Sequence, residues 1–203
     1  METDSYKTVK TLSQGLYKDK GSKFISFAYP VAEQESVKPI IDELKKKYHD
    51  SRHCCYAYMI GYQCQIWRVN DDGEPSGTAG KPILGQINSA GLTNILIAVV
   101  RYFGGTLLGT SGLINAYKCA AAAAINSAAV TEIFVKDHYQ IKFPYESLSG
   151  VMKILKEENA GFANQHFDLN CSMKIDFRIS NRHKILEKLS FINGMETIFI
   201  ERK

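Results

Sequence analysis

The hydrophobic and polar positions of the chain repeat with two different periods, which indicates a mixture of helices and strands. Apolar residues spaced three and four apart predict helices at 37–48, 81–90, 112–128 and 148–155 and after Asn181. Alternating or continuously apolar segments predict strands at 6–13, 23–31, 53–60, 64–69, 94–103, 131–136, 139–143, 162–168, 171–179 and 195–200. The glycine-containing polar segment 15–21 is predicted to be a loop.

The segment 94–103, NILIAVVRYF, is almost uninterrupted in its apolar character. It has the length of a strand and predicts one that is buried on both faces. Helix boundaries follow from capping residues: Ser36 and Ser111 are expected at N-caps, and Gly91 and Gly161 are expected just past helix ends.

The last third of the chain reads as βαββαβ. The apolar side chains of 171–179 alternate strictly with polar ones, so one face of that strand should be buried and the other wet. This order predicts a ferredoxin-like sandwich over residues 137–203, which follows a separate domain over residues 1–136. The fold class is therefore α+β.

The charge, the cysteines and the apolar segments of the chain each limit the class of protein that it can be. The 203 residues carry a net charge of +4, which permits a local polyanion site but not a general nucleic-acid clamp. The five cysteines form neither a CxxC pair nor an even framework, and free thiols fit a reducing cytoplasm. No apolar segment is long enough to cross a membrane, and the polar start does not resemble a leader.

The glycine-rich segment 104–112, GGTLLGTSG, follows the buried strand and precedes a helix. A helix N-terminus with free N–H groups can bind an anion, and Gly104 and Gly109 have the spacing of a phosphate loop. The lysine that such a loop needs is replaced by Thr110, which excludes a P-loop nucleotide triphosphatase. The alternative is that the glycines only shape a tight turn.

The acidic segment 71–82, DDGEPSGTAGKP, offers two kinds of chemistry. Its three acids could hold a metal ion, but their spacing is not that of a calcium loop. Ser76 could be a nucleophile, but its context is not GxSxG. The alternative is a turn that leads into a helix, since Asp, Gly, Pro and Ser favour turns.

Arg101 interrupts the apolar strand, and a buried charge is unfavourable unless it is paired. We expect Asp72 or Glu74 to be its partner, which would join the acidic segment to the glycine turn in one composite site. The alternative is that the guanidinium points to solvent at the strand end. His53, Cys54, Cys55 and Cys64 do not predict a metal site, because residues 54 and 55 point to opposite faces of a strand.

Four segments, taken in order, resemble the IMPACT family, in particular its bacterial YigZ-like members. They are KGSKFISFAYPV, SRHCCYAYMIG, DDGEPSGTAGKPIL and VVRYFGGTLLGTSGLINAY. The resemblance implies a first domain like ribosomal-protein S5 domain 2 and a link to translation. It also implies a pair of domains similar to the last two domains of the ribosomal translocase.

Two functional hypotheses follow. The first is a non-enzymatic, translation-associated regulatory or binding protein that contacts RNA, the ribosome or a translation-related protein, with no cofactor and no membrane partner. Its candidate site residues are Arg52, His53, Asp72, Glu74, Ser76, Thr78, Lys81, Arg101, Gly104, Gly105, Ser111 and Gly112. The second is a small hydrolase or metal-assisted enzyme that uses His53, Asp72, Glu74 and Ser76. The wet sheet face around Lys174, Asp176 and Arg178 is a further candidate surface for docking a protein.

Overall fold

The computed structural model describes residues 4–203 and has an α+β fold. It divides into two compact units. The first unit is formed by residues 6–133, and the second by residues 134–203 together with residues 4 and 5. Within the described residues, no helix is long and apolar enough to span a bilayer.

The first unit is built on a five-stranded sheet in the order β2-β3-β6-β4-β5. Its strands are β2 (Ser13–Asp19), β3 (Ser22–Pro30), β6 (Ile95–Tyr102), β4 (His53–Ile60) and β5 (Ile66–Asn70). All neighbouring strands are antiparallel. The central strand β6 is buried along nearly its whole length, which confirms the prediction for the apolar segment.

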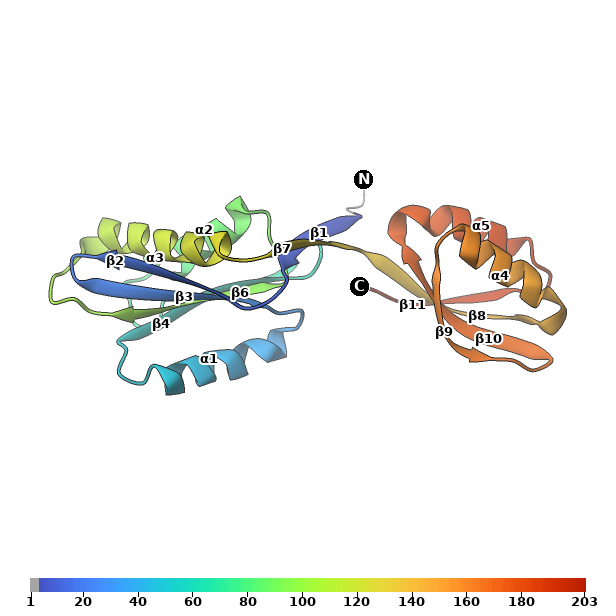
Figure 1. Cartoon of the computed structure of the whole chain (residues 1–203), viewed down its shortest axis with the longest axis horizontal. Helices are drawn as coiled ribbons and strands as arrows, with labels where there is room; N and C mark the ends of the chain where they lie inside the picture. Colours follow the sequence, from blue (N-terminus) through green and yellow to red (C-terminus); the bar gives the residue numbers. More distant parts are fainter. Residues whose placement is uncertain (1–3) are drawn as a thin grey trace. The chain divides into compact units, whose positions relative to one another are not determined.

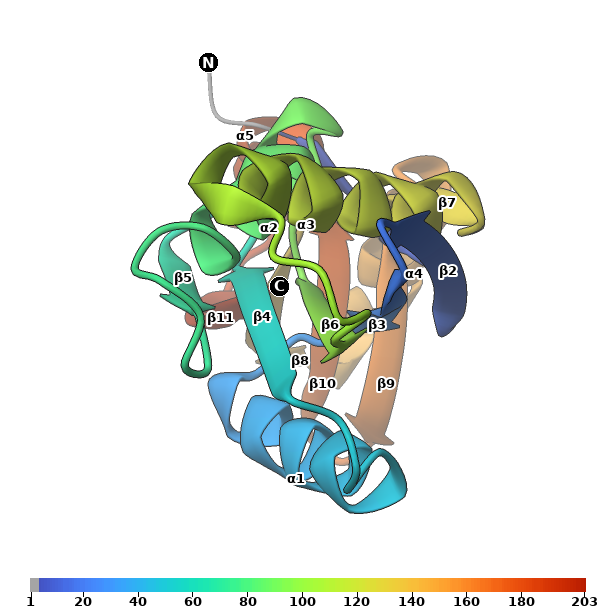
Figure 2. The same ribbon diagram turned by 90° about the vertical axis from the view of Figure 1, so that its left-hand side faces the viewer.

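Helices cover both faces of this sheet (Figure 1). Helix α1 (Val37–Lys47) lies on one face, and α2 (Gly80–Ser89) and α3 (Gly109–Asn126) lie on the other, as the view in Figure 2 also shows. Alternate residues of β6 point to opposite faces of the sheet. Val100 packs in the core beneath α1, and Val99 packs in the core beneath α2 and α3. The alanines of α3 let its backbone approach the sheet, and an added Cβ on Gly15 of β2 would lie 2.4 Å from the Ala124 nitrogen.

The predicted loop at 15–21 is wrong, because residues 13–19 form the edge strand β2 and the turn is confined to Lys20 and Gly21. Strand β2 lies at the edge of the sheet and carries polar side chains on its exposed face, so the sequence shows no clear apolar alternation there. The first predicted strand is shorter than expected: β1 (Ser5–Val9) pairs with β7 (Val130–Phe134) in a separate two-stranded sheet. This pairing brings the two ends of the first unit together.

Three predicted boundaries are also wrong. Helix α3 begins at Gly109, so Ser111 lies inside the first turn and is not the N-cap. Gly161 begins strand β9, while the preceding helix ends at Glu157. Cys64 lies in the loop before β5, with a φ of 57°. Ser36 does precede α1, but its side chain makes no capping hydrogen bond there.

The second unit has the predicted βαββαβ element order. Its elements are β8 (Lys136–Pro144), α4 (Leu148–Glu157), β9 (Gly161–His166), β10 (Asn170–Arg178), α5 (Arg182–Ser190) and β11 (Glu196–Arg202). Single 3₁₀ turns at Gln34–Ser36, Tyr145–Ser147 and Ile179–Asn181 precede α1, α4 and α5. The sheet order is β11-β8-β10-β9, with antiparallel neighbours throughout.

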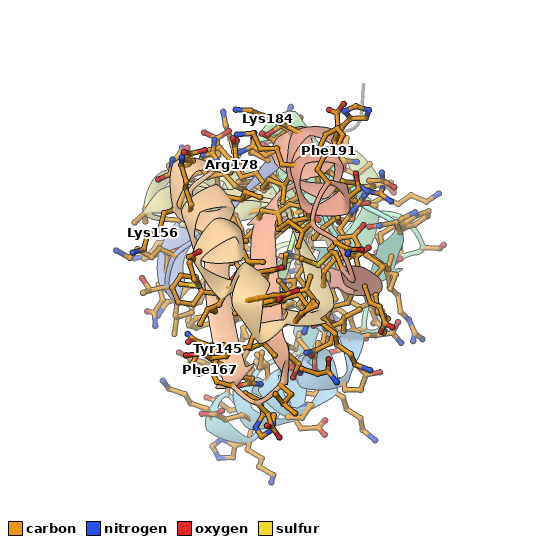
Figure 3. All side chains as sticks on the ribbon, turned by 90° about the vertical axis from the view of Figure 1, so that its right-hand side faces the viewer. Tyr145, Lys156, Phe167, Arg178, Lys184 and Phe191 are labelled. Carbon is orange, nitrogen blue, oxygen red and sulfur yellow. The ribbon has the colours of Figure 1, made fainter. Side chains whose placement is uncertain are left out.

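The buried face of this sheet packs on α4 and α5 and includes Met173 and Ile175 of β10, as the strict alternation predicted. Figure 3 views this unit and shows Tyr145 and Phe167 near one end and Phe191 toward the other. On the wet face, Asp176 pairs with Lys136 at 2.7 Å.

Candidate functional site

The centre of the candidate site is Arg101, near the end of the central strand. Strand register places Phe24 of β3 opposite Arg101 on one side and His53 of β4 opposite it on the other. Paired residues of an antiparallel sheet share a face, so all three side chains lie on the α3 side. The Arg101 guanidinium carbon lies 5.5 Å from the centre of the Phe24 ring and 5.8 Å from that of Phe103.

Glu74 is the partner of Arg101. The guanidinium Nη1 lies 2.6 Å from Glu74 Oε1, and the two side chains are only 7% and 3% exposed. The Tyr117 hydroxyl of α3 donates a second hydrogen bond to the same oxygen at 2.8 Å. The acidic segment, the central strand and α3 are thus joined at one buried carboxylate. This confirms the predicted ion pair and excludes the solvent-pointing alternative.

Asp72, the other predicted partner, does not contact Arg101. Its carboxylate instead accepts hydrogen bonds from the Lys45 ammonium of α1 and from the Cys54 backbone N–H, both at 2.6 Å. The hydrogen bond to Asp72 raises the pKa of Lys45. Asp72 therefore connects the acidic segment to the face of the sheet that is opposite Arg101.

Asp71 organises the acidic segment from within. Its two carboxylate oxygens accept hydrogen bonds from the backbone N–H groups of Gly77, Ala79 and Gly80 at 2.8, 3.0 and 2.8 Å. Burial alone would raise the pKa of Asp71, but these three N–H groups favour the ionised form, and its pKa is lowered. The segment is thus a structured turn that leads into α2, as the second interpretation of it predicted.

His53 bridges the acidic segment and the ion pair. Its Nδ1 lies 2.7 Å from the carbonyl oxygen of Asp72. A carbonyl oxygen only accepts, so Nδ1 must carry the hydrogen. The other ring nitrogen, Nε2, lies 3.9 Å from Glu74 Oε1.

The neighbouring thiols are buried. The Cys55 sulfur lies 2.9 Å from the Asp71 carbonyl oxygen and 3.3 Å from the Tyr117 hydroxyl oxygen, and its one hydrogen can be donated to either. Burial raises the pKa of both Cys55 and Tyr117, and it raises the pKa of Cys54 to about 11. In the part of the chain that the structure describes, no three His, Cys, Asp or Glu side chains are grouped as a metal site would require.

A cavity of about 490 Å³ opens beside the ion pair. It is lined by Arg52, His53, Glu74, Pro75, Arg101, Phe103, Leu107, Leu108, Gly109, Thr110 and Leu113. Four predicted site residues, Arg52, His53, Glu74 and Arg101, therefore meet at one place. A second, smaller hollow of about 210 Å³ shares Arg52 and His53 and includes Asp72.

The other predicted residues do not line this cavity. Ser76, Lys81 and Ser111 are exposed, and the Thr78 hydroxyl donates to the Pro75 carbonyl oxygen at 2.6 Å. Gly104 packs against Gly21, where an added Cβ would lie 1.9 Å from the Gly21 carbonyl carbon. Gly105 has a φ of 86° in the turn. The observed roles of Thr78, Gly104 and Gly105 are therefore structural.

Sequence reasoning did not include in the site the apolar lining or the residues that hold the carboxylates. Phe103, Leu107 and Leu108 flank the glycines, and the sequence predicts only a strand end and a turn there. Tyr117 is not among the predicted site residues, and Asp71 enters only as one of three acids. A signal was present for Tyr117, since a buried tyrosine hydroxyl usually requires a hydrogen-bond partner.

Comparisons with known proteins identify the family of this chain. The family model for the Impact N-terminal domain matches residues 20–125. The chain is 33% identical over 150 residues to the IMPACT family member YigZ of Escherichia coli (strain K12), covering 73% of this chain and 74% of the relative. It is 33% identical over 166 residues to the IMPACT family member YvyE of Bacillus subtilis (strain 168), covering 82% and 76%.

A solved structure described only as that of a hypothetical protein superposes with a TM-score of 0.73 at 27% identity and covers 98% of both chains. This likeness supports the α+β fold along nearly the full length. By its sequence and fold, the chain is a two-unit α+β protein of the YigZ-like type. It belongs to the IMPACT family.

Proposed function

We propose that this chain is a non-enzymatic, translation-associated regulatory protein that contacts RNA, free or in the ribosome, through the cavity beside Arg101. Membership of the IMPACT family supports a translation-related role. We also propose that its domains, 1–136 and 137–203, have S5-domain-2-like and ferredoxin-like folds. The strand orders β2-β3-β6-β4-β5 and β11-β8-β10-β9 support these assignments.

The observation that carries the RNA assignment is the state of Arg52. This arginine is exposed at the cavity, and among the described residues it forms no salt bridge. Arg101, by contrast, is neutralised by Glu74. An unpaired arginine beside a partly apolar cavity is suited to contact a phosphate of an RNA backbone. Association should therefore depend on salt concentration.

The enzymatic alternative has less support from the geometry. His53 contacts Asp72 and lies near Glu74, but Ser76 is exposed and makes no hydrogen bond to any of these three among the described residues. The Asp72 carboxylate is already held by Lys45 and the Cys54 N–H. If Mg²⁺, Mn²⁺ or Zn²⁺ raised the melting temperature of the protein, this would support a metal-assisted enzyme.

The test is co-sedimentation of the full chain with ribosomes and with bulk RNA across a salt series. The Arg52→Gln variant should bind more weakly and should reduce the salt slope by about one phosphate contact. Arg68→Gln is the matched control, because Arg68 is also an exposed arginine of this unit but lies outside the cavity. Arg101 is unsuitable for this test, because its replacement would break a buried ion pair.

If the chain does not associate with ribosomes or RNA at low salt, the RNA proposal is refuted and a protein partner becomes the favoured hypothesis. An affinity pull-down from cell extract would then be the next measurement. Equal weakening by Arg52→Gln and Arg68→Gln would keep the function but remove the site assignment.

A further inference from the structure

The lining of the cavity combines two kinds of side chain. Its polar part, here called the polar wall, consists of Arg52, His53, Glu74 and Arg101, and Glu74 lies near both His53 and Arg101. Its apolar part, here called the apolar wall, consists of Phe103, Leu107, Leu108, Leu113 and Pro75. A ligand that suits both parts carries a charged group and an apolar group.

The polar wall favours an anion. The only carboxylate in the lining, Glu74, already accepts hydrogen bonds from Arg101 and Tyr117. Over residues 4–203, the Arg101 Nε is the one buried side-chain nitrogen or oxygen without a hydrogen-bond partner. An unsatisfied buried donor is costly and requires an explanation, of which a bound water or ion is one.

The start of α3 adds backbone donors to the lining of the cavity. This helix has 18 residues, and the side chain at its N-cap position, Leu108, makes no capping hydrogen bond. Gly109 and Thr110 of its first turn line the cavity. The first N–H groups of a helix have no partner within the helix, and they carry a partial positive charge. They are suited to phosphate oxygens.

The apolar wall is open to a planar group. Phe103 is 45% exposed and Leu107 is 82% exposed, and both belong to the loop between β6 and α3. The Arg101 guanidinium lies near the Phe103 ring, at 5.8 Å from its centre. Nucleic-acid bases stack on such exposed rings. The volume of about 490 Å³ lies in the range of small-molecule sites, so a single nucleotide can be accommodated.

We propose that this cavity binds one nucleoside monophosphate unit. Its phosphate lies against Arg52 and the start of α3, and its base lies on Phe103 and Leu107. The inference rests on the proposed function in that it uses the same site, and it deepens that function by naming the unit that is recognised. The unit comes either from a free nucleotide or from the phosphorylated end of an RNA chain, and the two sources share this chemistry.

The test is titration calorimetry on the full chain with AMP, CMP, GMP and UMP, and with a short single-stranded RNA that does or does not carry a 5′-phosphate. Inorganic phosphate and the four nucleosides are the component controls. At least one monophosphate should bind tenfold or more tightly than either of its components. The 5′-phosphorylated RNA should exceed its unphosphorylated form by a similar factor if the natural source is an RNA end, and the two RNA forms should bind alike if it is a free nucleotide.

Two variants locate the two ends of the unit. Arg52→Gln should weaken monophosphate binding about tenfold or more, because it removes a charge-assisted contact. Phe103→Ser should reduce the affinity for the monophosphate toward that for inorganic phosphate. Both side chains are exposed, so the variants should fold, and Arg68→Gln should leave binding unchanged.

No binding of any monophosphate at millimolar concentration would overturn the inference, as would equal affinity for monophosphate and inorganic phosphate. The outcomes also separate it from the proposed function. Ribosome or RNA association without monophosphate binding refutes only the inference. Monophosphate binding without any ribosome or RNA association refutes the proposed function and leaves the inference standing.

Discussion

The buried ion pair allows a quantitative test of how the site is held together. Replacing Arg101 with Met keeps the aliphatic stem but leaves the Glu74 carboxylate buried with the Tyr117 hydroxyl as its remaining hydrogen-bond donor. Removing one partner of a buried pair costs about 3–5 kcal/mol, because the other charge is left uncompensated. For the first unit, residues 6–133, this corresponds to a fall in melting temperature of roughly 12–20 °C.

A double-mutant cycle separates the pair from its surroundings. Glu74→Gln alone should cost a similar amount, since it leaves the Arg101 guanidinium buried without a counter-charge. The double variant Arg101→Met/Glu74→Gln should lose clearly less than the sum, because no buried charge remains unpaired. The free energy of unfolding is measured by urea titration.

The chain has a built-in reporter for this assay. Trp67, its one tryptophan, lies on β5 of the first unit, so its fluorescence follows the unfolding of the unit that holds the pair. The matched control is Lys45→Met. The Lys45–Asp72 pair has the same N···O distance of 2.6 Å, but its side chains are 48% and 26% exposed. Its loss should cost under about 1 kcal/mol. Equal costs for Arg101→Met and Lys45→Met, or additive losses in the double variant, would refute the reasoning.

Three further predictions concern the surrounding structure. Asp71→Asn should destabilise the first unit by about 1–3 kcal/mol at pH 7. The Asp71 pKa is lowered in the folded state, so this difference should shrink as the pH falls below about 4, and a pH-independent loss in urea titrations would contradict it. Gly104→Ala should lower the free energy of unfolding by about 1–3 kcal/mol, because the added Cβ forces Gly21 away. The control Gly85→Ala should be neutral or stabilising, because no atom lies within 4 Å of its added Cβ. Equal melting temperatures of the two variants would disprove the close approach of Gly104 to Gly21. A thiol reagent at pH 8 should modify the exposed Cys64 before the buried Cys54, and mass mapping that found the reverse order would argue against the burial of β4.

The fold was predictable wherever side-chain period and burial coincide. The sequence predicts β6, which is apolar except near its end, and the alternating β10 for this reason. The strand β2 was missed because its exposed edge and Gly15 carry no apolar period, and Gly15 is explained only by the α3 backbone beside it. Such a contact between distant segments leaves no local signal.

The site was partly predictable because a charged side chain in a buried apolar strand is unfavourable unless an opposite charge lies beside it. Arg101 implied a carboxylate nearby, and Glu74 is that carboxylate. The choice between Glu74 and Asp72 depends on which face of the sheet each side chain points to. The sequence does not show this for two acids that are close together in a turn. The apolar wall was not predicted, because Phe103 and Leu107 become a surface only where β6, the turn and α3 converge.

The position of β6 also affects how the chain is synthesised. In the finished sheet β6 lies between β3 and β4, yet both of these strands precede it in the sequence. Until residues 95–102 have left the ribosome, β3 and β4 have no partner between them, and each has an edge open to wrong pairing. The sheet of the first unit can therefore be completed only after β6 has been synthesised, and a pause before residue 102 would leave these two strand edges unpaired.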